Sequence, residues 1–382
     1  MPTFALPHRT CITSPTSIVQ LEYPSSDSTG PVPLPKPDSG GHWTRFVLLS
    51  DTHTKRCDVP DGDVLLHSGD LTERGTLKEL RSTMEWLYAL PHPVKIIIAG
   101  NHDSAVHREW YEENWQELSL HRSNDAPEDF QGRRGNKSYI QSADAVLDLL
   151  KGPQAVTANI VYLEDEEYKF KVRDGGKEWS VYGSPWSPYY GDWAFGYERE
   201  DGEALISKFP KTDILLTHGP PRNILDLTIN KDRAGCDALA AALPTLRPKL
   251  HVFGHIHEAR GAFVHRWKPG SQLPGAQNAI QLGVEEKKGG TVAAAKEEQD
   301  EEEEEEYSDD ESGSDSGFGS ITLSEPEAGQ ETVDEAAGSE PVEETIFANA
   351  ANLPLGRNAW RAGVRVKMGG LGFQPIVVDL LE

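Results

Sequence analysis

The sequence has few cysteines and no long apolar run. Its 3 cysteines, Cys11, Cys57 and Cys236, are widely spaced, which argues against a disulfide framework and a structural zinc site. A reducing compartment is therefore expected, with the cytoplasm as the prediction and the nucleus as the alternative. The first residues lack a charged start followed by an apolar core, so we expect no signal peptide. No apolar run approaches membrane-spanning length, and we expect no membrane span.

Positive charge is also scarce. The chain has 37 Lys and Arg against 62 Asp and Glu, which gives a formal net charge of −25. Most of this excess lies in one block, because residues 285–344 contain 23 acidic and 3 basic residues. The remainder is only mildly acidic and shows no basic aromatic stripe. A protein that binds long nucleic acids is therefore not expected.

Composition divides the chain of 382 residues into four parts. Residues 1–43 are rich in Pro, Ser, Thr and Gly, and most of this segment is predicted to be a flexible N-terminal tail or an extended arm. Residues 44–284 carry the patterns of a folded domain. Residues 285–345 are predicted to be a disordered acidic insertion, either a solvated linker or a phosphorylated segment that binds a protein partner. Residues 346–382 are expected to complete the domain, since the last strand has no core of its own to join.

Alternating strand and helix patterns organise the first half of the domain. Thr44–Ser50, Val64–His67 and Val94–Ala99 are apolar runs typical of buried strands. A helix is predicted between the second and third of them, from a capping box at Thr76 to Pro91. Strand, helix and strand in this order predict a parallel sheet.

The second half of the domain follows a similar pattern. Further helices are predicted at 107–120, 142–150 and 237–243, and further strands at 159–163, 168–172, 178–182, 213–217, 250–253, 364–367 and 375–380. Asp174-Gly175-Gly176 is predicted to be a hairpin turn. Pro244 is expected to stop the helix that precedes it.

Polar side chains follow five of the predicted strands. They are Asp51 and His53, then Asp70, then Asn101 and His102, then His218, then His255 and His257. Residues two apart on an extended chain point the same way, so each Asp-x-His or His-x-His pair can offer two ligands to one site. Oxygen and nitrogen ligands without thiolate suit Mn²⁺, Fe, Zn²⁺ or Mg²⁺. Of these eight residues, seven candidate metal ligands are still too many for one closed zinc site and fit two adjacent metal ions that share a carboxylate.

These motifs resemble those of a known family. Asp51-Thr52-His53, Gly69-Asp70, Gly100-Asn101-His102-Asp103, His218 and Gly254-His255-Ile256-His257, in that order, are similar to the calcineurin-like metallophosphoesterase superfamily. The Thr217–Pro221 stretch and the ending Gln374–Leu380 resemble its small subgroup of metallophosphoesterase-domain-containing proteins. The resemblance implies an α/β fold, namely a four-layer α/β/β/α sandwich with two mixed sheets.

The resemblance also implies roles for the site residues. One metal ion would be held by Asp51, His53, Asp70 and His257, and the other by Asp70, Asn101, His218 and His255, with Asp70 bridging. Manganese is the favoured metal, and a metal-bridging water or hydroxide is the implied nucleophile. His102 would stabilise or protonate the leaving group, with Asp103 orienting it. Arg74 is expected to belong to the same catalytic set.

Two positions bear on the type of esterase. Glu73 stands where many members carry Asp, which keeps the charge and adds a methylene near Arg74. The chain has Asn-His-Asp where phosphoprotein phosphatases of the family usually have Asn-His-Glu, which favours a phosphodiesterase. We therefore expect hydrolysis of a small phosphodiester such as a cyclic nucleotide. The alternatives are a phosphomonoesterase or protein phosphatase, and a catalytically weak metal-binding scaffold.

Other aromatic and histidine residues have structural interpretations. The aromatic loop from Trp186 to Tyr197 is predicted to pack, and the alternative is a wall beside the metal ions that stacks on a base or an aromatic leaving group. Five histidines outside the motifs are interpreted as surface or core residues: His67, His92, His121, His251 and His265.

Overall fold

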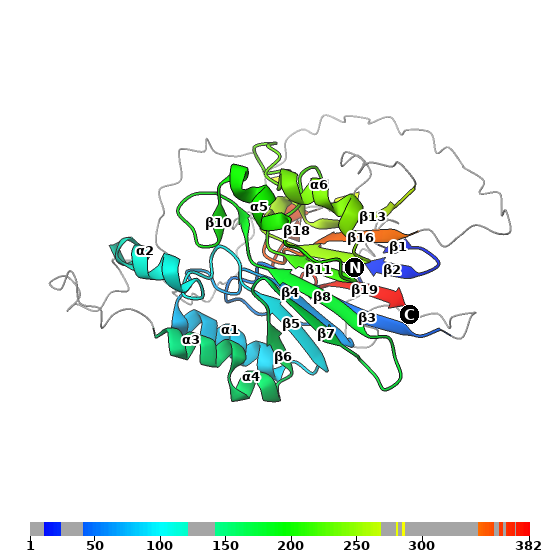
Figure 1. The fold of residues 1–382 in the computed structure, drawn as a ribbon, viewed down its shortest axis with the longest axis horizontal. Helices are drawn as coiled ribbons and strands as arrows, with labels where there is room; N and C mark the ends of the chain where they lie inside the picture. The colour runs from blue at the N-terminus through cyan, green and yellow to red at the C-terminus, as the bar shows by residue number, and fades with distance from the viewer. Residues whose placement is uncertain are drawn as a thin grey trace, which may run out of the picture. The chain divides into compact units, whose positions relative to one another are not determined.

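Two seven-stranded mixed sheets, packed face to face, carry the fold (Figure 1). The structure is a computed structural model that describes residues 11–23, 41–120, 142–268, 280–281, 285–286, 343–354, 359–361, 364–370 and 372–382. The described residues all belong to one compact unit, formed by residues 1–287 and 342–382.

The first sheet has the order β1-β2-β19-β3-β4-β5-β6. Strands β3 to β6 run parallel, whereas β19 pairs antiparallel with β3 on one side and with β2 on the other. The bounds of its strands are β1 (Cys11–Thr13), β2 (Ser17–Gln20), β3 (Trp43–Leu49), β4 (Val64–Ser68), β5 (Val94–Ile98), β6 (Ile160–Tyr162) and β19 (Ile376–Leu381).

The second sheet has the order β14-β13-β16-β12-β11-β8-β7. Its central strands β16, β12, β11 and β8 run parallel, and antiparallel strands flank them. The bounds are β7 (Glu166–Phe170), β8 (Trp179–Ser184), β11 (Ile214–Thr217), β12 (Leu250–Phe253), β13 (Gly261–Arg266), β14 (Ile280–Gln281) and β16 (Glu344–Asn349). Two smaller sheets contain β9 (Ser187–Pro188) with β10 (Gly196–Tyr197), and β15 (Glu285–Glu286) with β17 (Ala359–Arg361) and β18 (Val364–Arg365).

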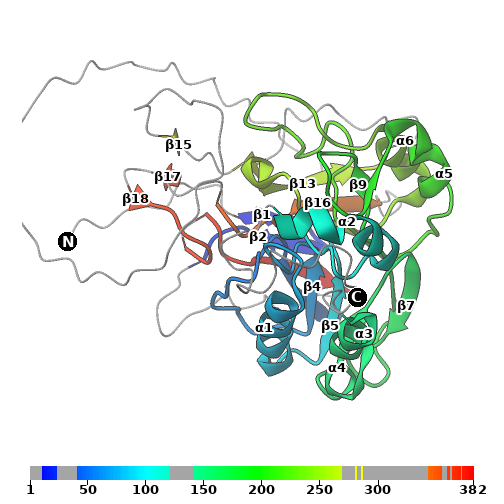
Figure 2. The same ribbon diagram turned by 90° about the vertical axis from the view of Figure 1, so that its left-hand side faces the viewer.

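Helices cover the outer faces of the sandwich. On the first sheet lie α1 (Leu77–Ala89), α3 (Ala143–Lys151) and α4 (Pro153–Thr157), and on the second lie α5 (Gly202–Ile206) and α6 (Asp237–Leu246) (Figure 2). The remaining helical elements are α2 (Arg108–Leu120), η3 (Arg199–Asp201) and η4 (His257–Ala259). Thr76 and Glu79 form the predicted capping box at the start of α1.

The burial pattern explains the four layers. In β3, Phe46 and Leu48 point into the core between the sheets, where Phe46 meets Trp179 of β8 edge to face. The alternate residues Val47 and Leu49 face α1 on the outside. A strand that is buried on both faces has a nearly continuous apolar sequence, and this pattern allows such strands to be predicted. The predicted four-layer α/β/β/α sandwich with two mixed sheets is confirmed.

The N-terminal segment differs from its prediction. Most of residues 1–43 was expected to form a flexible tail or an extended arm, but β1 and β2 form a hairpin and β2 pairs with β19 of the first sheet. Val19 and Leu21 are fully buried, so this hairpin adds apolar area to the core. The prediction failed because the partner strand lies more than 350 residues away in the sequence. Residues 1–10 and 24–40 lie outside the described part of the chain.

Three further boundaries differ. Pro244 does not stop α6 at once, because the helix continues to Leu246 and closes with a hydrogen bond from the Arg247 N–H to the Leu243 carbonyl. The proline removes only its own N–H donor. The predicted limits of the acidic insertion, 285 and 345, fall inside β15 and β16, and residues 287–342 lie outside the described part of the chain. The predicted strand at 364–367 is shortened to β18, which pairs in the small sheet with β17.

Within the described residues, no helix is both long and apolar enough to cross a membrane.

Candidate metal centre

The predicted site residues lie at the carboxyl ends of parallel strands from both sheets. Asp51 and His53 follow β3, Asp70 follows β4, and Asn101 follows β5. In the second sheet, His218 follows β11, and His255 and His257 follow β12. Because the two sheets pack with these edges together, residues separated by up to 206 positions meet in one cluster.

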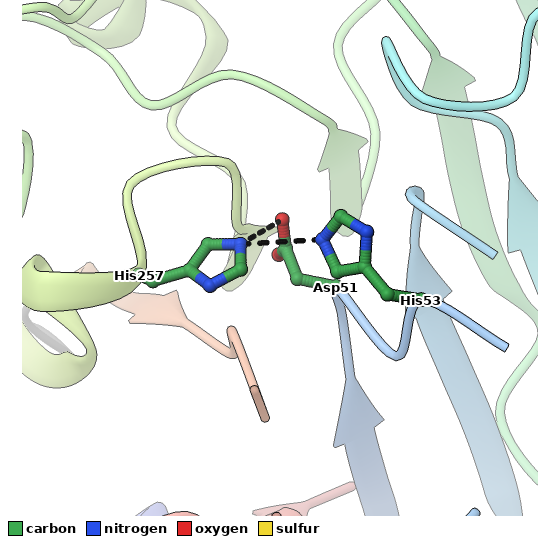
Figure 3. A group of neighbouring side chains, drawn as sticks. All are labelled: Asp51, His53 and His257. Carbon is green, nitrogen blue, oxygen red and sulfur yellow. Dashed lines mark hydrogen bonds and ion pairs between the residues drawn. The ribbon is translucent and has the colours of Figure 1, made fainter. Parts of the chain in front are cut away.

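One group of donors gathers around Asp51 (Figure 3). His257 Nε2 lies 3.2 Å from Asp51 Oδ1 and 3.4 Å from His53 Nε2. His53 Nε2 in turn lies 3.6 Å from Asp70 Oδ2. These four side chains are the predicted ligands of the first metal ion.

A second group gathers around Asn101. Its Oδ1 lies 2.8 Å from His218 Nε2 and 2.8 Å from His255 Nδ1. His218 Nε2 also lies 3.4 Å from Asp70 Oδ1. Asp70 therefore presents one carboxylate oxygen to each group, and the structure brings all seven predicted ligands together.

The backbone is strained where it presents several of these side chains. Asp51, His53, Asp70 and His255 have φ angles of 53°, 45°, 52° and 67°, in the left-handed region that costs free energy for residues other than glycine. Glycines let the chain approach the carboxylates: a Cβ on Gly254 would lie 2.0 Å from Asp51 Oδ2, and one on Gly100 would lie 2.4 Å from Asp70 Oδ1. Strain and close approach of this kind are typical of a functional site.

The protonation states suit a cation. Burial lowers the pKa of His255 to about 3, and burial together with neighbouring histidines holds the pKa of His53 well below its usual value, so both imidazoles are neutral donors at pH 7. Burial alone would raise the pKa of Asp51, but the facing His257 outweighs it and lowers that pKa.

The same pocket attracts positive charge. Burial opposes protonation of His257 and His218, but Asp51 and Asp70 respectively raise the pKa of these two imidazoles. Imidazole nitrogens, carboxylate oxygens and an amide oxygen lie close to one another, which is the donor set that divalent ions of this kind prefer. The residues present therefore fit the pair of metal ions predicted from the sequence.

His102 is oriented differently from the prediction. Its Nδ1 donates to the backbone carbonyl of Glu73 over 2.7 Å, and its ring stacks on Trp193 with centroids 4.1 Å apart. Asp103 was expected to orient His102, but its carboxylate accepts hydrogen bonds from the backbone N–H groups of Leu71, Thr72 and Gly100 and from the Thr72 hydroxyl. Asp103 thus joins the loops that carry Asp70 and Asn101, because a buried carboxylate needs several donors and these N–H groups are the nearest.

Arg74 and Glu73 occupy the rim of the site. The side chain of Arg74 is exposed, and its backbone N–H donates to the Glu79 carboxylate at the start of α1. The Glu73 carboxylate lies 3.6 Å from His53 Nδ1, a buried atom that makes no hydrogen bond among the described residues. The Glu73 side chain therefore faces the predicted ligand His53, and the Glu73 backbone carbonyl accepts the hydrogen bond from His102.

Two buried histidine–threonine pairs were not predicted as part of the site. His67 Nε2 lies 3.0 Å from Thr52 Oγ1, and Thr52 stands between Asp51 and His53 in the sequence. His251 Nε2 lies 2.9 Å from Thr217 Oγ1, directly before His218. Each pair thus forms a buried hydrogen bond to a threonine that stands next to predicted ligands in the sequence. The signal in the sequence is a histidine inside an otherwise apolar strand, and the core interpretation of these two histidines is confirmed.

The aromatic loop reaches the cluster. Trp193 stacks on His102, and Tyr190 lies edge-on to His255 with ring centroids 6.3 Å apart. Trp186 and Phe195 pack against His107 behind the loop. Part of this loop therefore packs, as predicted, and part lines the site.

A two-sheet α/β sandwich with carboxylate and imidazole donors at its strand ends defines a metal-dependent phosphoesterase. Comparison with known proteins agrees, because the family model of calcineurin-like phosphoesterases matches residues 38–259. The chain belongs to the calcineurin-like phosphoesterase family, within the subgroup of metallophosphoesterase-domain-containing proteins.

Several curated proteins are similar to this chain. Metallophosphoesterase domain-containing protein 1 of Homo sapiens is 36% identical over 251 residues, which cover 63% of this chain and 69% of that protein. UPF0046 protein T07D4.2 of Caenorhabditis elegans is 33% identical over 239 residues, which cover 59% of this chain and 53% of that protein. A probable rhamnogalacturonate lyase C of Emericella nidulans is 38% identical over 226 residues, which cover 58% of this chain but only 18% of that protein.

Proposed function

We propose that this protein is a phosphodiesterase that hydrolyses small phosphodiesters with two divalent metal ions, of which manganese is favoured. The observation that carries the proposal is the position of Asp70, whose two carboxylate oxygens face two separate groups of donors. Asp51, His53 and His257 would hold one ion with Asp70, and Asn101, His218 and His255 would hold the other with Asp70. When bound, such a pair of ions acidifies water and polarises phosphoryl oxygens.

The side chains around the ions would divide the remaining work. A ring nitrogen of His102 lies within 4.8 Å of donor atoms of His53 and Asp70, where a phosphoryl group would be held. Because Nδ1–H donates to the Glu73 carbonyl, Nε2 is the ring nitrogen left for the substrate. In its imidazolium form His102 would give the Nε2 proton to the departing alkoxide and become neutral. Asp103 would keep the spacing of the Asp70 and Asn101 loops fixed, because it binds both.

A phosphodiester is favoured over a phosphomonoester by the charge at the rim. Glu73 is exposed beside His53, Asp192 stands next to Trp193 in the aromatic loop, and Glu258 follows His257 in η4 and acts on its charge. A monoester carries a second negative charge that these carboxylates would repel, whereas a diester carries one. The expected substrates are small diesters such as cyclic nucleotides.

The test uses hydrolysis of bis(4-nitrophenyl) phosphate in Mn²⁺. Asp70→Ala removes the carboxylate shared by both groups, and His255→Ala removes a donor from one group. Both changes should abolish turnover and reduce bound metal, while Glu85→Ala on the exposed face of α1 should change neither. Unchanged turnover in both site variants would refute the proposed centre. Preference for 4-nitrophenyl phosphate over the diester would favour a phosphomonoesterase, and bound metal without turnover on either ester would favour a scaffold.

A further inference from the structure

The loop between β9 and β10 is braced at both ends. The two strands pair in parallel, with Ser187 opposite Gly196 and Pro188 opposite Tyr197. At one end the Tyr189 backbone N–H donates to the Tyr197 carbonyl over 2.8 Å, and at the other the Ser187 N–H donates to the Phe195 carbonyl over 3.0 Å. Within the loop the Tyr189 hydroxyl donates to Asp192 Oδ1 over 2.8 Å. The loop is therefore held in one shape by its own hydrogen bonds.

The braced loop reaches both halves of the metal centre. Trp193 stacks on His102 at an interplanar angle of 25°, and His102 lies beside His53 and Asp70. Tyr190 lies at 82° to His255, whose Nδ1 contacts Asn101. A phosphoryl group held at the centre would therefore carry its ester substituents into the space next to this loop.

Tyr190 differs from an ordinary surface aromatic. Its side chain is 73% exposed, although single exposed aromatics are common and carry no conclusion by themselves. Here the ring sits on a braced loop and meets a predicted ligand edge to face. Trp193 already uses one face against His102, so Tyr190 has the larger open ring surface of the two.

We propose that Tyr190 is a stacking platform for a planar ring carried by the phosphodiester substrate, with Trp193 fixing the loop against His102. The inference rests on the proposed function and names a substrate class for it: diesters in which the ester group that stays on the phosphorus bears a flat aromatic ring. That ring is either a simple aryl group or a nucleobase, since both offer the same stacking surface. Stacked aromatic pairs contribute enough to change kcat/KM by about 3- to 10-fold.

The experiment compares three diesters that share the 4-nitrophenolate leaving group. Their second ester group is phenyl, cyclohexyl or 5′-thymidine, so that the first two match in size and differ in planarity. Tyr190→Leu should lower kcat/KM about 3- to 10-fold for the phenyl diester, the thymidine diester or both, mainly through KM, and leave the cyclohexyl diester unchanged. Tyr190→Phe keeps the ring and should behave as wild type. Which diester shows the larger loss tells an aryl group from a nucleobase.

Two outcomes would overturn the inference. The first is that Tyr190→Leu changes kcat/KM equally on the planar and cyclohexyl diesters, or changes it on none of them. This would show that Tyr190 does not recognise a planar ring of the substrate, while the proposed function stands. Hydrolysis of no diester by the wild-type enzyme would overturn the proposed function and this inference with it. Bound metal and the thermal midpoint of Tyr190→Leu should equal those of wild type, because its exposed ring supports no core residue.

Discussion

His102 donates a hydrogen bond from Nδ1 to the backbone carbonyl of Glu73, with 2.7 Å between the two atoms. A carbonyl oxygen only accepts, so Nδ1 carries a proton and Nε2 is the ring nitrogen left for another partner. Trp193 stacks on the ring and holds its plane. The position of His102 is thus set by a backbone group and an aromatic side chain.

The first prediction concerns the leaving group. His102→Gln should lower kcat by about 10²- to 10⁴-fold for a diester with an alkoxide leaving group, which needs a proton as it departs. The loss should be much smaller with 4-nitrophenolate, which departs without protonation. The measurements are kcat on both esters and metal content by elemental analysis. Metal content should be unchanged, and its loss would instead make His102 a ligand.

The second prediction concerns Glu73. Its carboxylate lies 3.6 Å from His53 Nδ1, on the side of the ring away from Asp70. Carboxylates behind a ligating histidine fix its orientation and raise its basicity, so Glu73→Gln should weaken metal binding about 10-fold or more. Titration calorimetry with Mn²⁺ measures the change, and Glu85→Gln on α1 serves as the matched control. Equal affinities in the two variants would contradict this role.

Much of the architecture could be predicted because the parallel strands are buried on both faces. A short apolar run such as Phe46 to Leu49 is typical of a strand that is buried on both faces of a sheet. Polar residues directly after such runs mark the functional edge of the sheet. Five such ends in a family order predicted which seven donors meet, and the structure brings them together. Local sequence therefore carries both the sheet and the identity of the clustered residues.

Contacts made by residues outside these motif ligands could not be predicted. β2 pairs with β19 from the other end of the chain, and nothing near Val19 indicates that partner. Asp103 was expected to orient His102, because catalytic imidazoles commonly lean on a carboxylate, yet the chain turns its carboxylate toward Leu71 and Thr72. Tyr190 lies near His255 only because a braced loop crosses the site, and loop paths have no periodic signal.

The third prediction concerns Asp103. Each of its two carboxylate oxygens accepts two hydrogen bonds, one from Gly100 and Leu71 and the other from Thr72. Asp103→Asn replaces one oxygen by a donor, which leaves at least one buried N–H group facing an N–H; the Thr72 hydroxyl can avoid this by accepting from the amide and donating to the His102 carbonyl. Each unpaired group costs about 1–3 kcal/mol, so the free energy of unfolding should fall by about 1 kcal/mol or more. Denaturant unfolding measures it.

Asp174→Asn is the control for that experiment. Asp174 lies exposed in the turn between β7 and β8, so the same chemical change there should leave the free energy of unfolding unaltered. A fall below about 0.5 kcal/mol in Asp103→Asn would show that the two loops do not depend on this carboxylate.

His251 makes the stability of the protein depend on pH. It is fully buried beside Phe253 and Phe347, and its Nε2 pairs with Thr217 Oγ1, whose hydroxyl donates to the Gly219 carbonyl. Nδ1 makes no hydrogen bond among the described residues. Burial lowers the pKa of His251 to about 3, so the imidazole is neutral in the folded protein.

The last prediction follows from that neutral imidazole. In the unfolded chain the pKa of His251 returns to about 6.5, so the unfolded state binds more protons below that pH. Its contribution to stability is therefore present above about pH 6.5 and is lost as the pH falls toward about 3, by up to about 1.4 kcal/mol per pH unit. His251→Phe removes this titration, so urea unfolding in EDTA between pH 7.5 and 5 should show a shallower pH slope than wild type. His42→Phe, at an exposed position, should keep the wild-type slope. Identical slopes in all three proteins would mean that His251 is already protonated when folded, since only then would its removal leave proton uptake on unfolding unchanged.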